Sequence, residues 1–474
     1  MERQVEPTRL LIFKNMRCIY LILLASVFFQ ACISETIPKA HIELNNPIIP
    51  GYFADPSIVE YEGKFFIYAT VDPWGAEFLG CWVSEDFQNW TFHKLNWPTK
   101  AACTSEKSNH NNVWAPSVIR KGNTFYMYVS VGSEVWCGKA DHPLGPWKNI
   151  LDNKPMILFD TSLYYHVIDA EAYIGSNGKA YLYWGSGWEW VNGHCFVAEL
   201  NEDMSSVKTE PKEITPSHYF EAPFMVKHNG KYFLTYSQGK TIDKTYEVRY
   251  AIGDNPLGPF IEADNSPILK TNDSLQVYGP GHHTIFDYKE KHYILYHRHS
   301  LPFVTGTALR QICINELAYD DTTLLIKNIS PALTVSFPNL VKEEIEYIKP
   351  KLITASSEQN KYLSVKNIID DNNATRWEPS SRDNLTTIIC SFEDNTHFGS
   401  MKIKFEYPWK DYFIKIESST DEKNWKLVSD YSEYGISGSP VSIPINDSAT
   451  FIRITFNKWD NKNKPSIWKL SFIK

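Results

Sequence analysis

The feature that most constrains the fold is a motif that occurs five times along the chain. Each copy is a short signature followed by a turn and an aromatic-rich segment. The turn-and-strand segments span residues 62–70, 121–130, 176–185, 228–237 and 288–297. The signatures before them are ADPS (54–57), WAPS (114–117), IDAEAY (168–173), EAPF (221–224) and GPGHHT (279–284). Successive signatures are 52 to 61 residues apart, so the motif is a true long-period repeat.

A repeat of roughly 50 residues that is built from short strands is typical of a blade-by-blade array. Five copies predict a five-bladed β-propeller, which we expect to span residues 46–341. Equivalent points of the blades face one axis in such a fold. The signatures, scattered over more than two hundred residues, are therefore expected to converge in space.

The chain changes character after the repeats. Residues 341–349 are charged and are interpreted as a linker. Residues 350–474 contain short alternating strands with turns between them, a pattern that favours a β-sandwich. The predicted fold class is therefore all-β, with a five-bladed propeller followed by a sandwich domain.

Composition excludes some classes of partner. The 474 residues exceed one ordinary domain, and 43% of them are apolar, which supports large cores. The net charge is −8 and lysine and arginine do not cluster, which argues against nucleic acid as a partner. Aromatic residues make up 14% of the chain. They suit a protein that stacks on sugar rings, although core packing accounts for most of them.

The N-terminus predicts export. Residues 10–31 form the only strongly apolar stretch, and its length fits a signal peptide better than a membrane span. The stretch ends in FQAC, which resembles a bacterial lipobox in which Cys32 is lipidated. Residues 1–32 are thus interpreted as a lipoprotein signal, and 33–46 as a tether. The expected location is the bacterial cell envelope, periplasm or outer-membrane surface, with the lipid as the only membrane contact. An ordinary signal peptide and a buried Cys32 are the alternatives.

Beyond Cys18 and Cys32, six cysteines occur and none forms a CxxC pair, so a zinc knuckle is not expected. Six cysteines allow fifteen pairings, and the sequence does not choose among them. Free buried thiols are the alternative. The six are Cys81, Cys103, Cys137, Cys195, Cys313 and Cys390.

Three signatures place a carboxylate near the predicted axis, at Asp55, Asp169 and Glu221. Clustered carboxylates raise one another's pKa. Glycoside hydrolysis uses such an arrangement, because one carboxyl group must stay protonated while another is ionised. Glu171 lies two residues after Asp169 on the same side of a strand, so spacing alone does not separate these two.

The signatures ADPS, WAP, ID, EAP and GxGH, in this order and spacing, resemble glycoside hydrolase family 43 over the whole propeller. The resemblance implies that Asp55 is the general base, that Glu221 is the general acid, and that Asp169 orients the acid and tunes its pKa. It also implies hydrolysis with inversion, and it favours Asp169 over Glu171. The family more often has EGP where this chain has EAP.

Each of these assignments has a structural alternative. Asp55 precedes a proline and is a common turn residue in that position. Glu221 is compatible with an exposed strand end, but its apolar neighbours Phe220 and Ala222 favour the raised pKa of a proton donor.

The fifth blade offers a histidine and an arginine. The resemblance places His282 near the axis, often beside a bound calcium or a water cluster. We therefore expect no required cofactor but allow a structural calcium, with a purely hydrogen-bonding histidine as the alternative. Arg298 resembles a family arginine that contacts the sugar, since its donor fork suits paired hydroxyls. A surface salt bridge is the alternative for Arg298.

Aromatic residues are candidates for sugar contact. Trp74 and Trp114 are suited to form the apolar floor under a terminal sugar, or to pack in the core, and His166 is a candidate rim residue. In the C-terminal region, segments 355–377 and 418–425 resemble discoidin-like sandwiches, which include family 32 carbohydrate-binding modules. No clear binding triad is present there. Three tryptophans remain as a sugar platform or as core residues: Trp377, Trp409 and Trp459.

Together these features predict an exo-acting, inverting glycosidase whose partner is an oligo- or polysaccharide of plant type. The activities implied by the resemblance are α-L-arabinofuranosidase and β-xylosidase. One alternative is a galactan-active member of the same family. Another is a surface lipoprotein that binds glycans without cleaving them.

Overall fold

The computed structural model describes residues 40–474 apart from 109, 161, 163, 342–344, 381–384, 458 and 460–463. The predicted signal peptide, the lipobox with Cys32, and the first half of the tether lie outside the described residues. Within the described part of the chain, no helix has the length and apolar character needed to cross a bilayer.

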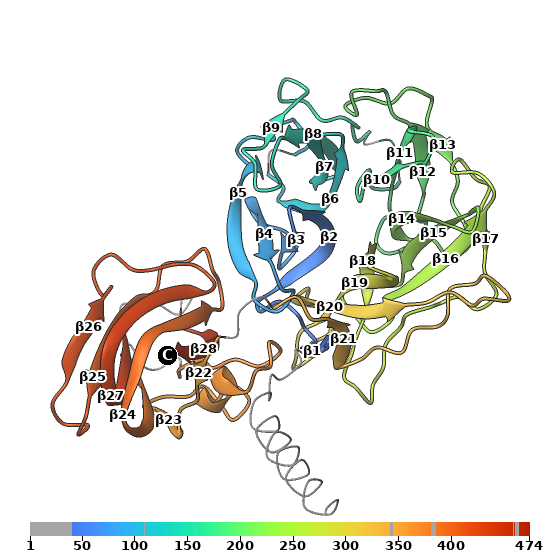
Figure 1. Ribbon diagram of the computed structural model, residues 1–474. Coiled ribbons are helices and arrows are strands. Elements are labelled where there is room, and N and C mark those ends of the chain that lie inside the picture. Colours follow the sequence, from blue (N-terminus) through green and yellow to red (C-terminus); the bar gives the residue numbers. More distant parts are fainter. Residues whose placement is uncertain are drawn as a thin grey trace, which may run out of the picture. The chain divides into compact units, whose positions relative to one another are not determined.

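Five antiparallel sheets follow one another along the chain, as the repeat predicts (Figure 1). Blade one contains β2 (Phe53–Tyr61), β3 (Lys64–Val71), β4 (Phe78–Ser84) and β5 (Thr91–Thr99). Blade two contains β6 (Val113–Lys121), β7 (Thr124–Val131), β8 (Glu134–Ala140) and β9 (Lys148–Asn149). Blade three contains β10 (Glu171–Ile174), β11 (Ala180–Trp184), β12 (Phe196–Glu199) and β13 (Lys212–Glu213). Blade four contains β14 (Glu221–His228), β15 (Lys231–Gln238), β16 (Glu247–Gly253) and β17 (Ile261–Glu262). Blade five contains β18 (Gly281–Tyr288), β19 (Lys291–His299) and β20 (Arg310–Leu317).

The aromatic segments found in the sequence form the second strand of each blade, and these strands are buried almost throughout. In four blades a glycine with a φ between 61° and 81° closes the hairpin before this strand, a conformation that favours glycine. The fifth blade uses Lys289, with a φ of 54°, in the corresponding turn. The repeat was thus a correct indicator of a five-bladed propeller.

One residue of each signature adopts a left-handed backbone conformation, with φ between 41° and 58°. In four of the blades the register of the first hairpin shifts at this point, as in a β-bulge. The five residues are Asp55, Ala115, Asp169, Ala222 and His282. In blade four the equivalent of Asp55 is therefore Ala222, and Glu221 stands one residue earlier.

Neighbouring blades are joined at these same residues. A side chain at the end of one blade's second strand accepts the amide proton of the next blade's left-handed residue. The pairs are Thr70 Oγ1 with Ala115 N (2.7 Å), Ser130 Oγ with Asp169 N (3.0 Å), Ser237 Oγ with His282 N (2.9 Å) and His297 Nδ1 with Asp55 N (3.5 Å). The last pair links blade five to blade one and closes the ring.

The ring is also closed by main chain from its two ends. Strand β1 (His41–Asn45) pairs with β21 (Thr334–Pro338). The amide of Ile48 then donates to Ile312 O in β20 (2.9 Å). Residues from before the first blade thus complete the last one, which has three strands of its own.

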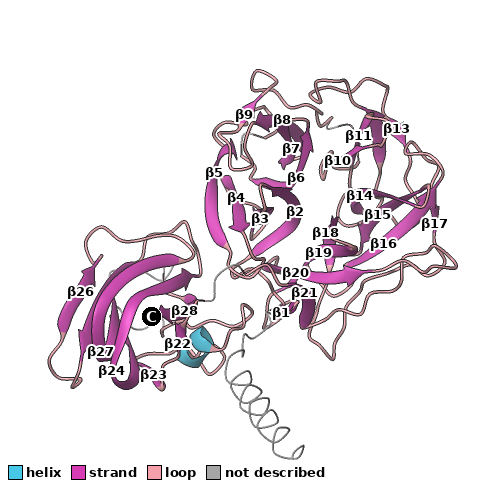
Figure 2. Cartoon of the chain, in the orientation of Figure 1, coloured by secondary structure: helices cyan, strands magenta, loops and turns pink. Residues whose placement is uncertain are grey.

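The C-terminal domain is a separate antiparallel β structure (Figure 2). Its described elements are β22 (Tyr347–Ile348), β23 (Leu352–Ala355), η1 (Val365–Ile369), β24 (Thr386–Phe405), β25 (Phe413–Ser419), β26 (Lys426–Asp430), β27 (Val441–Asn457) and β28 (Ile467–Ile473). The predicted all-β class, with a propeller and a second β domain, is confirmed. The domain begins earlier than expected, because β22 pairs with β28 although its residues were interpreted as linker.

The three C-terminal tryptophans are not an exposed platform. Trp377 is fully buried in the domain core, and Trp459 packs against that core. Trp409 packs on aromatic rings of the first blade, with its ring centroid 5.6 Å from Phe78 and 6.3 Å from Phe53. The tryptophans of this domain therefore stabilise it and its junction with the propeller.

The six cysteines that follow the signal region are all buried and free. Among the described residues the fold is therefore held by packing and hydrogen bonds, and burial raises the pKa of thiols such as Cys137.

Candidate active site

The first residues of the innermost strands line a cavity of about 380 Å³, toward the small end of the usual size range of ligand pockets. Asp55, Asp169 and Glu221, from blades one, three and four, all face it. The structure therefore brings together three carboxyl groups that are up to 166 residues apart in the sequence.

Asp55 is buried and held as an anion. Its Oδ2 accepts a hydrogen bond from Thr70 Oγ1 (2.7 Å), and its Oδ1 accepts one from Arg310 Nη1 (2.9 Å). Burial alone would raise its pKa. The guanidinium of Arg310 and the nearby imidazoles of His282 and His297 outweigh burial and hold the pKa of Asp55 well below its ordinary value.

Arg310 is itself fixed by a second carboxylate. Arg310 Nη2 donates to Asp72 Oδ1 (2.7 Å), and Arg310 Nε donates to Asp72 Oδ2 (2.9 Å), a bidentate pair. The Arg310 backbone amide also donates to Asp72 Oδ2 (2.8 Å). Burial raises the pKa of Asp72 to about 6, although Arg310 acts against this rise. The arginine side chain thus donates two hydrogen bonds to Asp72 and one to Asp55.

Glu221 has the opposite electrostatic environment. Its Oε1 accepts from Tyr246 Oη (2.7 Å) and its Oε2 accepts from Ser186 Oγ (3.0 Å), but no cation forms an ion pair with it among the residues that the structure describes. Burial raises the pKa of Glu221 despite these two hydrogen bonds, and the charge of Asp55 raises it further.

Asp169 is coupled to Glu221. Burial, followed by the charges of Glu221 and Asp55, raises the pKa of Asp169 well above its ordinary value. The backbone amide of Ala222, the residue after Glu221, donates a hydrogen bond that partly offsets this rise. Burial and mutual repulsion therefore disfavour full ionisation of both carboxyl groups.

His282 lies between Asp55 and Asp169. Its Nδ1 is 3.3 Å from Asp55 Oδ1 and 3.7 Å from Asp169 Oδ2. Burial lowers the pKa of His282, so the neutral imidazole is favoured.

Asp169, Glu221 and His282 offer ligand atoms within 4.8 Å of one another and could hold an ion. The set fits calcium poorly, because calcium prefers six to eight oxygen ligands and this set includes an imidazole nitrogen. A cation there would also favour ionised Glu221, against the effect of burial.

Aromatic side chains form the remaining wall. Trp74 and Trp114 line the cavity as predicted, and so does His166. Trp188 stacks on His166 with ring centroids 4.3 Å apart. Trp190 donates from Nε1 to Thr241 Oγ1 (3.1 Å), which fixes its indole ring at the same cavity.

Arg298 is placed elsewhere. It is buried, it does not line the cavity, and its Nη1 donates to Gln276 O (3.1 Å). The cavity arginine is Arg310, at the start of β20. Glu171 also does not line this cavity, whereas Asp169 does. The family resemblance favoured Asp169 as the site residue, whereas spacing alone did not choose between Asp169 and Glu171.

Sequence reasoning missed several residues of the site. One sequence signal was present for Arg310, since an arginine opens the strand RQICINEL, whose centre is the apolar run ICI. Another was the aromatic pair in the loop GSGWEWVNG between the second and third strands of blade three. Nothing in the sequence marked the two hydroxyl donors to Glu221. The missed residues are Asp72, Ser186, Trp188, Trp190, Thr241, Tyr246 and Arg310.

The chain matches two family models. The model of glycosyl hydrolases family 43 matches residues 44–324, which is more than half of the chain and includes every residue of the carboxylate cavity. The chain belongs to glycoside hydrolase family 43. The model of the F5/8 type C domain matches residues 352–470 in the C-terminal domain, and this agrees with the discoidin-like resemblance. The family membership makes a carbohydrate the substrate.

Named relatives differ in their activities. A β-D-galactofuranosidase of Aspergillus niger is 32% identical over 302 residues, which cover 60% of this chain and 84% of the relative. An arabinoxylan arabinofuranohydrolase of Bacillus subtilis is 28% identical and is matched over 61% of this chain and 65% of its own length. A xylosidase/arabinosidase of Bacteroides ovatus is 26% identical, and the match covers 58% of this chain and 94% of the relative.

A solved structure described as a glycoside hydrolase resembles both domains. It is 25% identical, has a TM-score of 0.77, and covers 90% of this chain and 99% of its own. The arrangement of a family 43 propeller followed by a second β domain is therefore shared with a known protein.

Proposed function

We propose that the protein is an inverting, exo-acting glycosidase that removes terminal sugars from plant-type polysaccharides. The observation that carries the proposal is the electrostatic contrast between Asp55 and Glu221. Arg310 keeps Asp55 ionised, whereas burial keeps a proton on Glu221. One ionised and one protonated carboxyl group at a single cavity is what glycoside hydrolysis requires.

The two groups act in one displacement. Asp55 takes a proton from a water molecule, whose oxygen attacks the anomeric carbon. As the new C–O bond forms, the glycosidic C–O bond breaks, and Glu221 gives its proton to the departing oxygen. We assign Asp169 to the orientation of Glu221, because it is held by the backbone amide of Ala222, the next residue, and because the charge of Glu221 acts on the pKa of Asp169. After the reaction Asp55 is protonated and Glu221 is ionised. Proton exchange with solvent returns both carboxyl groups to their starting states.

The cavity suits a single terminal sugar. Its volume of about 380 Å³ is small, and tryptophans line it, including Trp74, Trp114 and Trp188. Aromatic faces pack on the apolar faces of sugar rings, while the carboxylates and Arg310 offer partners for hydroxyl groups. Among terminal sugars we propose α-L-arabinofuranose first and β-D-xylose second, since relatives with these activities are among those matched.

The test is hydrolysis of nitrophenyl α-L-arabinofuranoside and β-D-xyloside by the wild type, Asp55→Ala and Glu221→Gln. General acid or base catalysis contributes about 10²–10⁴-fold, so each variant is expected to lose activity on that order. Proton NMR of the first product should show inversion at the anomeric carbon, and retention would contradict the roles given to the carboxyl groups. Glycan binding without hydrolysis in the wild type and both variants would favour the non-catalytic alternative.

β-D-galactofuranose is a third candidate for the terminal sugar. It is favoured by the A. niger relative, which has 32% identity and is named a β-D-galactofuranosidase. Nitrophenyl β-D-galactofuranoside belongs in the same assay, together with branched arabinan, arabinoxylan and galactan oligosaccharides. The substrate with the highest kcat/KM identifies the terminal sugar.

We propose that the protein is exported and anchored by lipid on Cys32, on the basis of the apolar stretch and the FQAC motif. Cys32→Ala is expected to move the full-length protein from the membrane fraction to the soluble fraction, and Cys18→Ala is the matched control. Unchanged fractionation of Cys32→Ala would exclude the anchor.

A further inference from the structure

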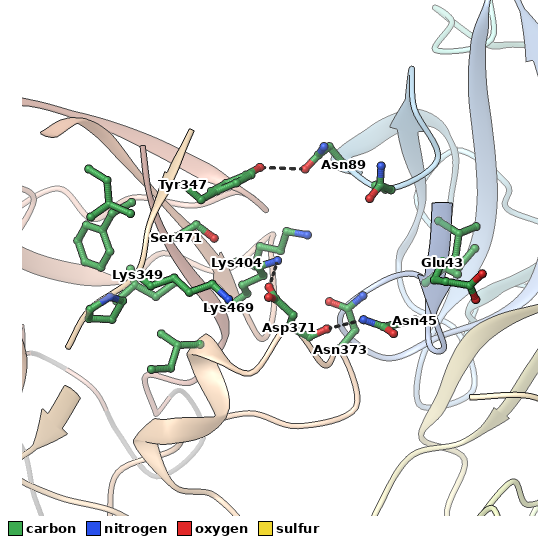
Figure 3. Close-up of a pocket in the computed structure, with 18 of the residues that line it drawn as sticks. Glu43, Asn45, Asn89, Tyr347, Lys349, Asp371, Asn373, Lys404, Lys469 and Ser471 are labelled. Atoms are coloured by element: carbon green, nitrogen blue, oxygen red, sulfur yellow. Dashed lines mark hydrogen bonds and ion pairs between the residues drawn. The ribbon is translucent and has the colours of Figure 1, made fainter. Parts of the chain in front are cut away.

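A second cavity lies where residues of the C-terminal domain meet residues from the first part of the propeller. Its volume is about 380 Å³, and it is distinct from the catalytic cavity because the two share no residue. Figure 3 shows the side chains of Lys349, Lys404 and Lys469 on one side of this cavity and those of Asn45 and Asn89 across from them. Lysines gathered at a cavity are unexpected in a chain with a net charge of −8.

Two of the lysines are forced together by strand pairing. Lys404 on β24 and Lys469 on β28 are direct cross-strand partners, an arrangement that is destabilising for like charges. Lys469 Nζ is paired with Asp371 Oδ1 at 2.7 Å. Among the residues that the structure describes, no carboxylate oxygen lies within 4.0 Å of the ammonium group of Lys404 or Lys349.

The positive charge on Lys404 is not compensated. Burial, followed by the charges of Lys469 and Lys402, lowers the pKa of Lys404 to about 7, and the charges of Asp86 and Asp371 only partly oppose this. An anion in the cavity would remove the repulsion and accept hydrogen bonds from the ammonium groups.

The polar groups of the lining suit a sugar, and they lie beside the carboxylates of Glu43 and Asp371, which also line the cavity. Asn45, Asn89 and Ser471 provide amide and hydroxyl groups to the cavity, the groups that commonly bind sugar hydroxyls. Tyr347 is 45% exposed, and its hydroxyl is 3.5 Å from Asn89 Oδ1. Its ring offers an amphipathic face for a pyranose.

We propose that this cavity is a second glycan-binding site, which takes a uronic acid residue of an acidic polysaccharide. The carboxylate is held by Lys404 and Lys349, and the ring hydroxyls are held by the amides across the cavity. The site would retain the enzyme on acidic regions of the same polysaccharide whose neutral terminal sugars the propeller removes. Binding at this site does not depend on the catalytic roles proposed above.

The test is isothermal titration of the full-length protein with methyl β-D-glucuronoside and methyl α-D-galacturonoside. Methyl β-D-glucoside, inorganic phosphate and a triglutamate peptide serve as comparison ligands. We expect binding of at least one uronide, and weaker binding of the neutral glucoside by roughly tenfold or more, since hydrogen bonds to a charged group are worth about that factor. Equal binding of phosphate or triglutamate would overturn the proposal in favour of a general anion site.

Two variants test the residues. Lys404→Met is expected to weaken uronide binding roughly tenfold, while Lys423→Met, on a surface turn of the same domain away from the cavity, is the matched control. Ser471→Glu places a carboxylate within the cavity, so it should abolish uronide binding and raise the melting temperature. Full uronide binding by both cavity variants would exclude this site. Hydrolysis of nitrophenyl glycosides should be the same in all three variants and the wild type, so failure here is distinguishable from failure of the catalytic assignment.

Discussion

Replacement of Arg310 by glutamine is the sharpest test of the proposed general base. Arg310 donates one hydrogen bond to Asp55 and two side-chain hydrogen bonds to Asp72, and all three groups are buried. In the wild type the pKa of Asp55 lies below its ordinary value, so Asp55 is ionised throughout the range in which the protein is assayed. Without the guanidinium, burial is no longer outweighed and the pKa of Asp55 must rise.

The magnitude follows from the contact that is lost. A hydrogen bond to a charged group contributes about 1.5–3 kcal/mol, and 1.36 kcal/mol corresponds to one pKa unit. The pKa of Asp55 should therefore rise by at least about one to two units, and the acidic limb of kcat/KM should move to higher pH by the same amount. Activity on the acidic side falls because the base becomes protonated, and it recovers as the pH rises.

The assay is a pH profile of kcat/KM on the best nitrophenyl glycoside, with circular dichroism at each pH to verify folding. Arg310→Lys is the matched variant. It keeps the charge but not the fork that contacts both carboxylates, so it should show an intermediate shift. If the glutamine variant is folded and its acidic limb coincides with that of the wild type, Asp55 is not the base or Arg310 does not control it.

Three further predictions concern the same cavity. Tyr246→Phe removes a hydrogen bond that lowers the pKa of Glu221, so the alkaline limb of kcat should move to higher pH; a shift to lower pH would contradict the role of Glu221 as acid. Trp188→Ala removes a ring that stacks on His166, and KM should rise up to about tenfold with kcat little changed, because an aromatic contact is worth about 0.5–1.5 kcal/mol. A fall in kcat as large as the expected rise in KM would instead indicate that Trp188 contributes to stabilisation of the transition state. Chelation with EDTA should leave kcat unchanged, since the cluster of Asp169, Glu221 and His282 fits calcium poorly, and loss of activity restored by calcium would show a required ion.

The sequence predicted the fold well because a propeller repeats its local signals. The aromatic second strands recur in each blade and hairpin glycines such as Gly63 and Gly230 recur in four of them, so each copy supports the others. The carboxylates Asp55, Asp169 and Glu221 were found for the same reason, since they stand in or beside the repeated signatures.

The other site residues were not predictable in this way. Arg310 and Arg298 belong to neighbouring strands of one blade, and which of them reaches the cavity depends on the register between β19 and β20. Tyr246 and Ser186 meet Glu221 from positions outside any signature. The Tyr246 contact forms within blade four, and the Ser186 contact forms only when blades three and four pack together. Contacts between residues that only the tertiary structure brings together are not visible as a pattern in a single sequence. The lysine pair of the second cavity is similar, since only strand pairing places Lys404 beside Lys469.

The hydrogen bond between His297 and the amide of Asp55 has a consequence for inactivation by heat. Because it joins the last blade to the first, the position of the proposed base depends on the seam of the ring, where chain segments from opposite ends of the propeller meet. The acid side, in contrast, is supported by contacts between consecutive blades. Loosening of the seam would thus displace the base while the acid stays in place, and loss of catalysis on heating would precede loss of β structure.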